Sequence, residues 1–195
     1  MHRIMHRVNT IEQLVNTPVE LGIEVDIRSY DKEIIIHHDP FIIGESFDKW
    51  LNFFKHGLLI LNVKEEGLEK RLLELMKKND IEDFFFLDQS FPFLKKTIDM
   101  GENRCAVRIS EYESIETALS LSGKVEWAWI DCFSKFPLKY NDAKNLKDAG
   151  YKLCFVSPEL QGPIKLEKIL LFKKNIESLG IIGDAVCTKQ PDIWL

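Results

Sequence analysis

Short apolar runs alternate with helical patterns along the whole chain, and this alternation constrains the fold more than any other feature. Seven segments have apolar residues three or four positions apart and predict helices, at 10–15, 46–54, 67–78, 91–100, 114–121, 141–149 and 166–178. Eight apolar runs predict strands, at 3–5, 23–28, 58–63, 83–87, 105–109, 126–132, 152–156 and 184–187. Strands that alternate with helices pair in parallel through right-handed crossovers, and eight such units close a barrel. We therefore predict an α/β fold, a compact (β/α)8 TIM barrel, with an open doubly wound sheet as the alternative.

Length and composition predict one domain that spans residues 1–195. A chain of 195 residues with 45% hydrophobic content can bury one sizeable core but hardly two. No low-complexity segment or linker rich in Pro, Gly or Ser divides the sequence. We expect a monomer or a homodimer, because the aromatic segments 84–86 and 127–129 are rich enough to form a dimer contact.

The charge balance excludes several classes of partner. A net charge of -5 argues against a nucleic-acid surface, which needs an excess of basic residues, and does not favour an anionic membrane either. The longest apolar runs are far shorter than the roughly 20 residues of a membrane helix, so we expect no membrane span. The amino terminus has no basic head followed by a long apolar stretch, which indicates a cytoplasmic protein.

Charged and polar residues stand where the first predicted strands end, although packing gives no reason for them to be there. Glu24 and Asp26 are two positions apart in a strand and so share one face, as do Asn62 and Lys64. Two carboxylates on one face repel each other and raise a pKa unless a cation holds them ionised. Oxygen ligands of this kind suit Mg²⁺ or Ca²⁺, and the Asn62 amide oxygen could complete the set.

Two histidines, a lysine and an arginine are predicted to lie at the same end of the barrel. His6 ends the first strand, and His38 ends a polar turn and short strand that follow the second strand. Imidazole titrates near neutrality and suits general acid and base catalysis. Lys64 could neutralise a phosphate oxygen, and Arg108 is a candidate for a second phosphate contact on the predicted strand 105–109. Active sites of (β/α)8 barrels lie at this face of the fold.

The pairs His6-Arg7, Glu24-x-Asp26 and His38-Asp39 resemble the motifs of the glycerophosphodiester phosphodiesterase family. The resemblance spans the chain, and its most specific part is the first 64 residues. It implies that His6 and His38 are the catalytic base and acid, that Glu24 and Asp26 hold a divalent metal, and that Arg7 and Lys64 contact the phosphate. The reaction implied is hydrolysis of a small soluble phosphodiester, or transfer of the phosphoryl group to an internal hydroxyl.

Two departures from the family pattern bear on this hypothesis. Asn62 stands where the family has an acidic ligand, so one negative charge is missing, and the long insertion before the family's Glu-Asn-Thr is reduced to Asn9-Thr10. An alternative is therefore a catalytically impaired barrel that binds a phosphorylated ligand without turnover. A third possibility is a barrel enzyme acting on a sugar phosphate, such as an isomerase or aldolase, but the order of the His and Glu-x-Asp motifs argues against it.

Overall fold

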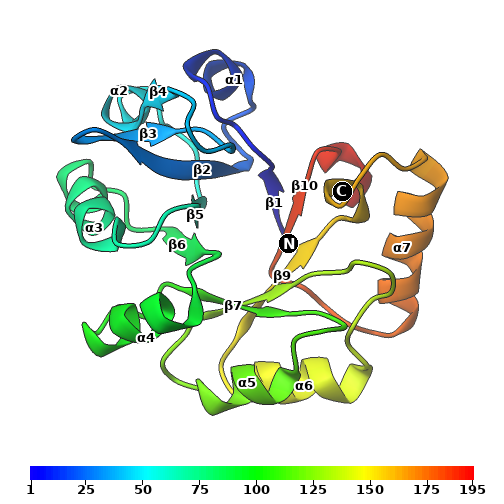
Figure 1. Ribbon diagram of the computed structural model, residues 1–195. Helices are drawn as coiled ribbons and strands as arrows, with labels where there is room; N and C mark the ends of the chain where they lie inside the picture. Colours follow the sequence, from blue (N-terminus) through cyan, green and yellow to red (C-terminus); the bar gives the residue numbers. More distant parts are fainter. The chain divides into compact units, whose positions relative to one another are not determined.

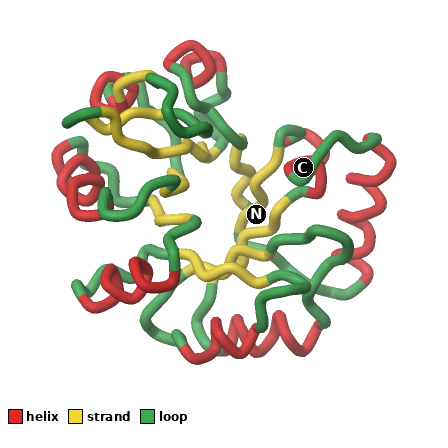
Figure 2. Tube along the Cα trace, viewed as in Figure 1, coloured by secondary structure: helices red, strands yellow, loops and turns green.

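The computed structural model describes residues 1–195, which form two compact units of α/β structure (Figure 1). Residues 5–102 make up one unit, and residues 1–4 together with 103–195 make up the other. In both units strands and helices alternate along the chain, as Figure 2 shows. The two units are described in turn.

The sheet of the unit 5–102 is built around β2 (Gly22–Tyr30). This strand pairs in parallel with β5 (Leu59–Val63), which pairs in parallel with β6 (Phe84–Leu87). On its other edge, β2 pairs with the antiparallel strand β3 (Glu33–Ile36), and the two-residue strand β4 (Glu45–Ser46) follows. The hairpin of β2 and β3 is the predicted excursion after the second strand.

Four helices accompany these strands: α1 (Ile11–Asn16), α2 (Phe47–Leu51), α3 (Glu69–Lys78) and α4 (Phe91–Asp99). Thr10 starts α1 with a capping box, in which its hydroxyl accepts a hydrogen bond from Gln13 and the Gln13 side chain accepts one from Thr10. The strands β5 and β6 are buried at every position, which explains why their sequences are continuous apolar runs. Their carboxyl ends are therefore the places where polar side chains can reach solvent.

The other unit is also built on parallel strands. The strands β7 (Ala106–Ile109), β8 (Trp127–Ile130), β9 (Lys152–Val156) and β10 (Ala185–Thr188) pair in that order, and β1 (His2–Met5) lies next to β10. The helices are α5 (Ile115–Ser120), α6 (Tyr140–Asp148) and α7 (Leu166–Ser178), with short 3-10 turns η1 (Pro158–Leu160) and η2 (Pro191–Trp194). None of the helices in the chain has the length and apolar content needed to cross a membrane.

The predicted elements agree with the structure, with a few differences of physical interest. All eight predicted strands and seven predicted helices are present, and the sequence signal missed only the two-residue strand β4 and the 3-10 turns. Ser114 caps α5 through its side chain, whereas Ser46 precedes α2 without a side-chain hydrogen bond. The aromatic segments considered for a dimer contact are buried in the core, so that suggestion is wrong; monomer or homodimer stays a prediction.

The four cysteines behave as small buried hydrophobic residues. Cys105, Cys132, Cys154 and Cys187 are all buried and form no disulfide. Burial, assisted by the negative charges of Glu111 and Asp131, raises the pKa of the Cys132 thiol to about 12, so the thiol stays protonated. These cysteines therefore contribute packing rather than nucleophiles.

Candidate functional site

Three polar side chains from two neighbouring strands meet at the carboxyl ends of β2 and β5. Glu24, Asp26 and Asn62 are all buried, although a carboxylate is almost never fully buried without a partner. The parallel ladder places Asp26 opposite Asn62, and the Asn62 Nδ2 donates a hydrogen bond of 2.7 Å to Glu24 Oε1. The residues that the sequence put on one face of each strand thus lie together in the structure.

Each carboxylate is held by donors from several segments. The backbone N–H of Arg7 donates to Glu24 Oε2 at 2.7 Å, and the Asn9 amide donates to Asp26 Oδ2 at 2.8 Å. Arg7 Nε lies 3.6 Å from Asp26 Oδ2, and Lys64 Nζ lies 3.5 Å from Asp26 Oδ1. The two cations thus lie against Asp26, whereas Glu24 is held by hydrogen bonds from neutral donors.

The backbone is strained at two of these positions. Arg7 and Asp88 adopt positive φ angles of 56° and 61°, in the left-handed region that residues other than glycine seldom occupy. The turn at Arg7 follows β1 and directs its N–H to Glu24, while Asp88 follows β6 and accepts a hydrogen bond of 3.3 Å from Lys64 Nζ. Strained residues of this kind cluster at active sites and ligand-binding sites.

The two predicted catalytic histidines occupy different surroundings. His6 is largely buried, with its Nε2 3.7 Å from Glu24 Oε2. The imidazole of His38 is more exposed, and its Nδ1 lies 2.8 Å from the Asp39 carboxylate. That hydrogen bond lowers the pKa of Asp39 and directs the other nitrogen of His38 away from the carboxylate. A cavity of about 610 Å³ brings His38 together with Arg7 and Asn9.

Arg28 holds the elements that carry His38 and Lys64, and the sequence did not single it out for this role. Its Nε and one terminal nitrogen donate to the carbonyl oxygen of His38 at 3.0 and 2.9 Å, and its other terminal nitrogen donates to the carbonyl of Lys64 at 3.1 Å. Because a guanidinium is planar and rigid, these bonds fix the two backbone segments relative to each other. Asn9 was also missed as a site residue, although Asn9-Thr10 stands where the family has its Glu-Asn-Thr motif.

Burial changes the acidity of Glu24. The pKa of this carboxyl rises from 4.5 to about 7, first because it is desolvated and second because the charge of Asp26 lies close by. Hydrogen bonds from Asn62 and Arg7 and the charge of Lys64 oppose the rise. The repulsion that the sequence predicted for two carboxylates on one face is thus present.

The donor set at the strand ends fits a hard divalent cation. Asp26 Oδ1 and Asn62 Oδ1 are buried oxygens that accept no hydrogen bond, and buried polar atoms seldom remain so without a ligand. Carboxylate and amide oxygens are the ligands that Mg²⁺ and Ca²⁺ prefer. The set holds only two acids, and no three His, Cys, Asp or Glu side chains in the chain are arranged so that they could hold a metal ion by themselves.

Between pH 4.5 and about 7, we expect the metal-free protein to lose stability as the pH rises. The folded state raises the pKa of Glu24 from 4.5 to about 7, so over this range it binds the Glu24 proton more tightly than the unfolded chain does. Raising the pH removes that proton and leaves a buried charge, at a cost of about 3 kcal/mol. Urea unfolding in EDTA at a series of pH values measures the loss. Above pH 7, Glu24→Gln should be more stable relative to the wild type than it is at pH 4.5. If the stability of the wild type and of Glu24→Gln depended equally on pH, the raised pKa of Glu24 would be contradicted.

Arg108 lies on β7 in the unit that contains residues 103–195. Its guanidinium pairs with Asp131 at 2.8 Å and lies 3.9 Å from Glu113. Its role as a second phosphate contact stays a prediction.

Glu159 follows β9 in the sequence and is buried. Its carboxylate accepts hydrogen bonds from Thr188 Oγ1 and the Lys189 N–H, so it ties η1 to the end of β10.

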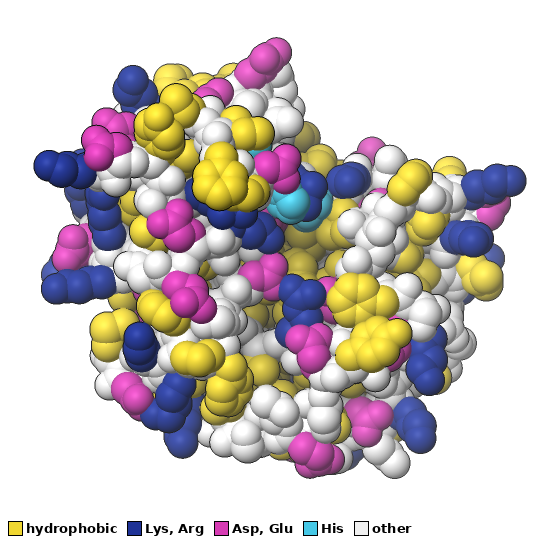
Figure 3. Space-filling view, in the orientation of Figure 1, with side chains coloured by type: hydrophobic (Ala, Val, Ile, Leu, Met, Phe, Trp, Pro, Cys, Tyr) yellow, Lys and Arg dark blue, Asp and Glu magenta, His cyan; other side chains and the backbone are white.

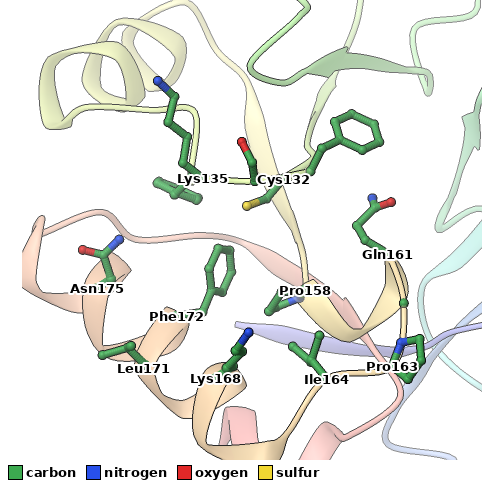
Figure 4. A pocket seen from close by; sticks show the side chains of 14 residues that line it. Cys132, Lys135, Pro158, Gln161, Pro163, Ile164, Lys168, Leu171, Phe172 and Asn175 are labelled. Carbon is green, nitrogen blue, oxygen red and sulfur yellow. The ribbon is translucent and has the colours of Figure 1, made fainter.

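A second cavity lies in this unit, at the carboxyl ends of β8 and β9 (Figure 4). It has a volume of about 620 Å³ and is bounded by the segments 132–136 and 158–164 and by α7. Figure 4 shows the Lys168 side chain reaching between Phe172 and Ile164, and the lining residues include two lysines and no acid. Parallel α/β folds bind ligands at this end of their strands. No motif in the sequence marked these residues.

The fold is similar to that of glycerophosphodiester phosphodiesterases of known structure. The enzyme from Agrobacterium tumefaciens matches with a TM-score of 0.68 and 11% identity, over 99% of this chain and 98% of its own. A glycerophosphoryl diester phosphodiesterase from Parabacteroides distasonis matches with a TM-score of 0.67 and 13% identity, over 98% of this chain and 84% of its own. No protein-family model matches the sequence, and no curated protein matches it. The resemblance seen in the sequence therefore extends to the fold, over nearly the whole chain.

Proposed function

We propose that this chain is a cytoplasmic, metal-dependent phosphodiesterase on a (β/α)8 barrel, which hydrolyses a small phosphodiester as glycerophosphodiester phosphodiesterases do. The observation that carries the proposal is the meeting of Glu24, Asp26 and Asn62 beside His6 and two cations, at the strand ends of one unit. The similarity of fold to two glycerophosphodiester phosphodiesterases supports it. Neither the substrate nor the metal is implied by fold alone.

Glu24, Asp26 and Asn62 would hold the metal, Mg²⁺ or Ca²⁺. When bound, the ion supplies positive charge that stabilises the charge developing on the phosphate oxygens. Arg7 and Lys64 would add to that charge, and the exposed part of the Arg7 guanidinium lines the cavity that also contains His38. Arg108 is proposed as a further phosphate contact.

His6 and His38 would perform the proton transfers. His6 would act as the base that takes a proton from the attacking water or hydroxyl, with Glu24, 3.7 Å away, stabilising the imidazolium that forms. His38 would act as the acid, because its Nδ1 is bound to Asp39 and its Nε2 is left to donate a proton to the departing alkoxide.

A second function, a barrel that binds a phosphorylated ligand without cleaving it, is favoured by one observation. Asn62 donates its amide to Glu24, and Lys64 and Arg7 lie against Asp26, so protein groups already contact both carboxylates. A metal must compete with these cations. In this alternative Arg7 and Lys64 would bind the phosphate of the ligand.

Removal and return of the metal separates the two functions. We expect hydrolysis of bis(p-nitrophenyl) phosphate and of glycerophosphodiesters to stop in EDTA and to return with Mg²⁺, Ca²⁺ or Mn²⁺. The double variant Glu24→Ala/Asp26→Ala should show no return with any metal, because it lacks both carboxylates. Circular dichroism establishes that the variant is folded. Hydrolysis that persists in EDTA would refute metal dependence, and folded protein without activity under any condition would favour the binding function.

A further inference from the structure

The loop between β3 and β4 exposes three large apolar side chains in a row. Phe41 is fully exposed, Ile42 is 47% exposed and Ile43 is 67% exposed. Single exposed apolar residues are ordinary on a protein surface, but contiguous ones mark a binding surface more often. These three residues, Phe41, Ile42 and Ile43, are called the apolar loop below.

The apolar loop is held firmly at its base. Ile36 pairs with Glu45 across β3 and β4, and the Glu45 carboxylate accepts a hydrogen bond of 2.8 Å from the Ile11 N–H. Gly44 packs so closely that a Cβ atom there would lie 2.0 Å from the Ile36 carbonyl oxygen. On the other side, Arg28 fixes the carbonyl of His38. The exposed side chains thus belong to a short loop with a defined position.

The backbone of the apolar loop is strained where it presents its largest side chain. Phe41 has a φ angle of 63°, in the left-handed region that bulky residues rarely adopt. Such strain persists only where the surrounding structure imposes it, as the fixed base of this loop does. A large exposed aromatic residue in this conformation gains nothing for the stability of the chain, which points to a role in binding.

The apolar loop adjoins the polar cavity of the candidate site. Ile43 lines that cavity together with Arg7 and His38, and Phe41 follows the His38-Asp39 pair by two residues. Figure 3 shows hydrophobic side chains next to histidine and basic side chains on the face of the molecule in view. The cavity therefore has cationic and imidazole groups within it and an apolar rim on one side.

We propose that the substrate is a phosphodiester that carries an alkyl or acyl chain, and that the apolar loop contacts this chain while the phosphodiester group lies beside Arg7 and His38. The proposal rests on the proposed function and names its substrate class. The rim is one short loop, which suits the chain of a single molecule. Acidic residues at Asp31, Glu33 and Asp39, together with a net charge of -5, disfavour docking on an anionic membrane.

The test compares glycerophosphocholine with octyl- and dodecylphosphocholine, each below the concentration at which it forms micelles. We expect kcat/KM to rise, and the Kd from calorimetry to fall, by at least about tenfold from glycerophosphocholine to dodecylphosphocholine, since each buried methylene favours binding. The variant Phe41→Ser/Ile42→Ser, which leaves the cavity-lining Ile43 in place, should lose most of this gain and keep its turnover of glycerophosphocholine. The variant Val19→Ser/Met100→Ser removes apolar residues of similar exposure elsewhere in the same unit and should behave as the wild type.

The possible outcomes distinguish this inference from the function on which it rests. Hydrolysis of all three compounds at rates independent of chain length would overturn the inference and leave the phosphodiesterase intact. If binding strengthened with alkyl-chain length in the wild type but not in the variant of the apolar loop, and no compound were hydrolysed, the contact between the apolar loop and the alkyl chain would be supported. The proposed phosphodiesterase function would then be refuted. Binding only above the micelle concentration would overturn the inference in favour of a lipid surface. A lower mass in light scattering for the Phe41→Ser/Ile42→Ser variant than for the wild type would overturn it in favour of a second copy of the chain.

Discussion

Replacing His6 or His38 by alanine is expected to lower kcat for phosphodiester hydrolysis by about 10²- to 10⁴-fold. Each change removes one of the two groups that would transfer protons, while the packing around the site remains. His6 is the more buried of the two and lies 3.7 Å from Glu24, and His38 is bound to Asp39 at the edge of the cavity. Steady-state kinetics with saturating metal measures the loss, and thermal unfolding establishes that both variants are folded.

His2 and His37 provide matched controls for this experiment. His2 is exposed on β1, so His2→Ala should keep full activity. His37 lines the same cavity as His38, but its Nδ1 accepts a hydrogen bond of 3.0 Å from the Asp39 N–H, which indicates a role in holding the loop. His37→Ala should therefore cost much less than His38→Ala. If the losses were reversed, His37 would be the acid, and unchanged turnover in both His6→Ala and His38→Ala would remove the assignment altogether.

The arrangement of elements could be predicted from the sequence because most strands are short, largely apolar runs bounded by polar residues. In a parallel sheet both faces of a strand are buried, so a run such as Phe84–Leu87 has no polar position until it ends. The strand β4 could not be predicted, because two residues, Glu45 and Ser46, carry no periodic signal. Which strands pair with which, as β2 does with β5, depends on contacts distant in sequence, for which local patterns give no measure.

The strand-borne part of the candidate site was predictable for a geometric reason. Alternation along a strand put Glu24 and Asp26 on one face, and the parallel register placed Asn62 beside them. The residues that hold the site from outside the strands were not predictable. Asn9 reaches Asp26 and Arg28 reaches two carbonyls through loop conformations that no spacing rule describes. The same is true of the positive φ angles of Arg7 and Phe41, which only the folded chain imposes.

Replacing Asn62 by aspartate is expected to make the metal-free protein less stable and to make the protein bind a divalent metal more tightly. The Asn62 amide now donates to Glu24 and helps to keep it ionised. A carboxylate there removes the donor and adds a third buried negative charge, which should lower the free energy of unfolding in EDTA by about 1–3 kcal/mol. When Mg²⁺ or Ca²⁺ is present, the added carboxylate becomes a ligand of the ion. We therefore expect the Kd of the metal to fall at least about tenfold.

Thermal unfolding over a metal titration measures both effects, and Asn79→Asp is the control. Asn79 ends α3 and donates to the Leu75 carbonyl away from the site, so the same chemical change there should leave metal binding unaltered. Activity then decides between the two proposed functions. If Asn62→Asp hydrolyses diesters while the wild type does not, the amide is what weakens the metal site and the natural chain is a binding protein. If the wild type already turns over with metal, two carboxylates and an amide are sufficient for catalysis in this fold. Metal affinity unchanged by Asn62→Asp would show that the ion, where one binds, is held elsewhere.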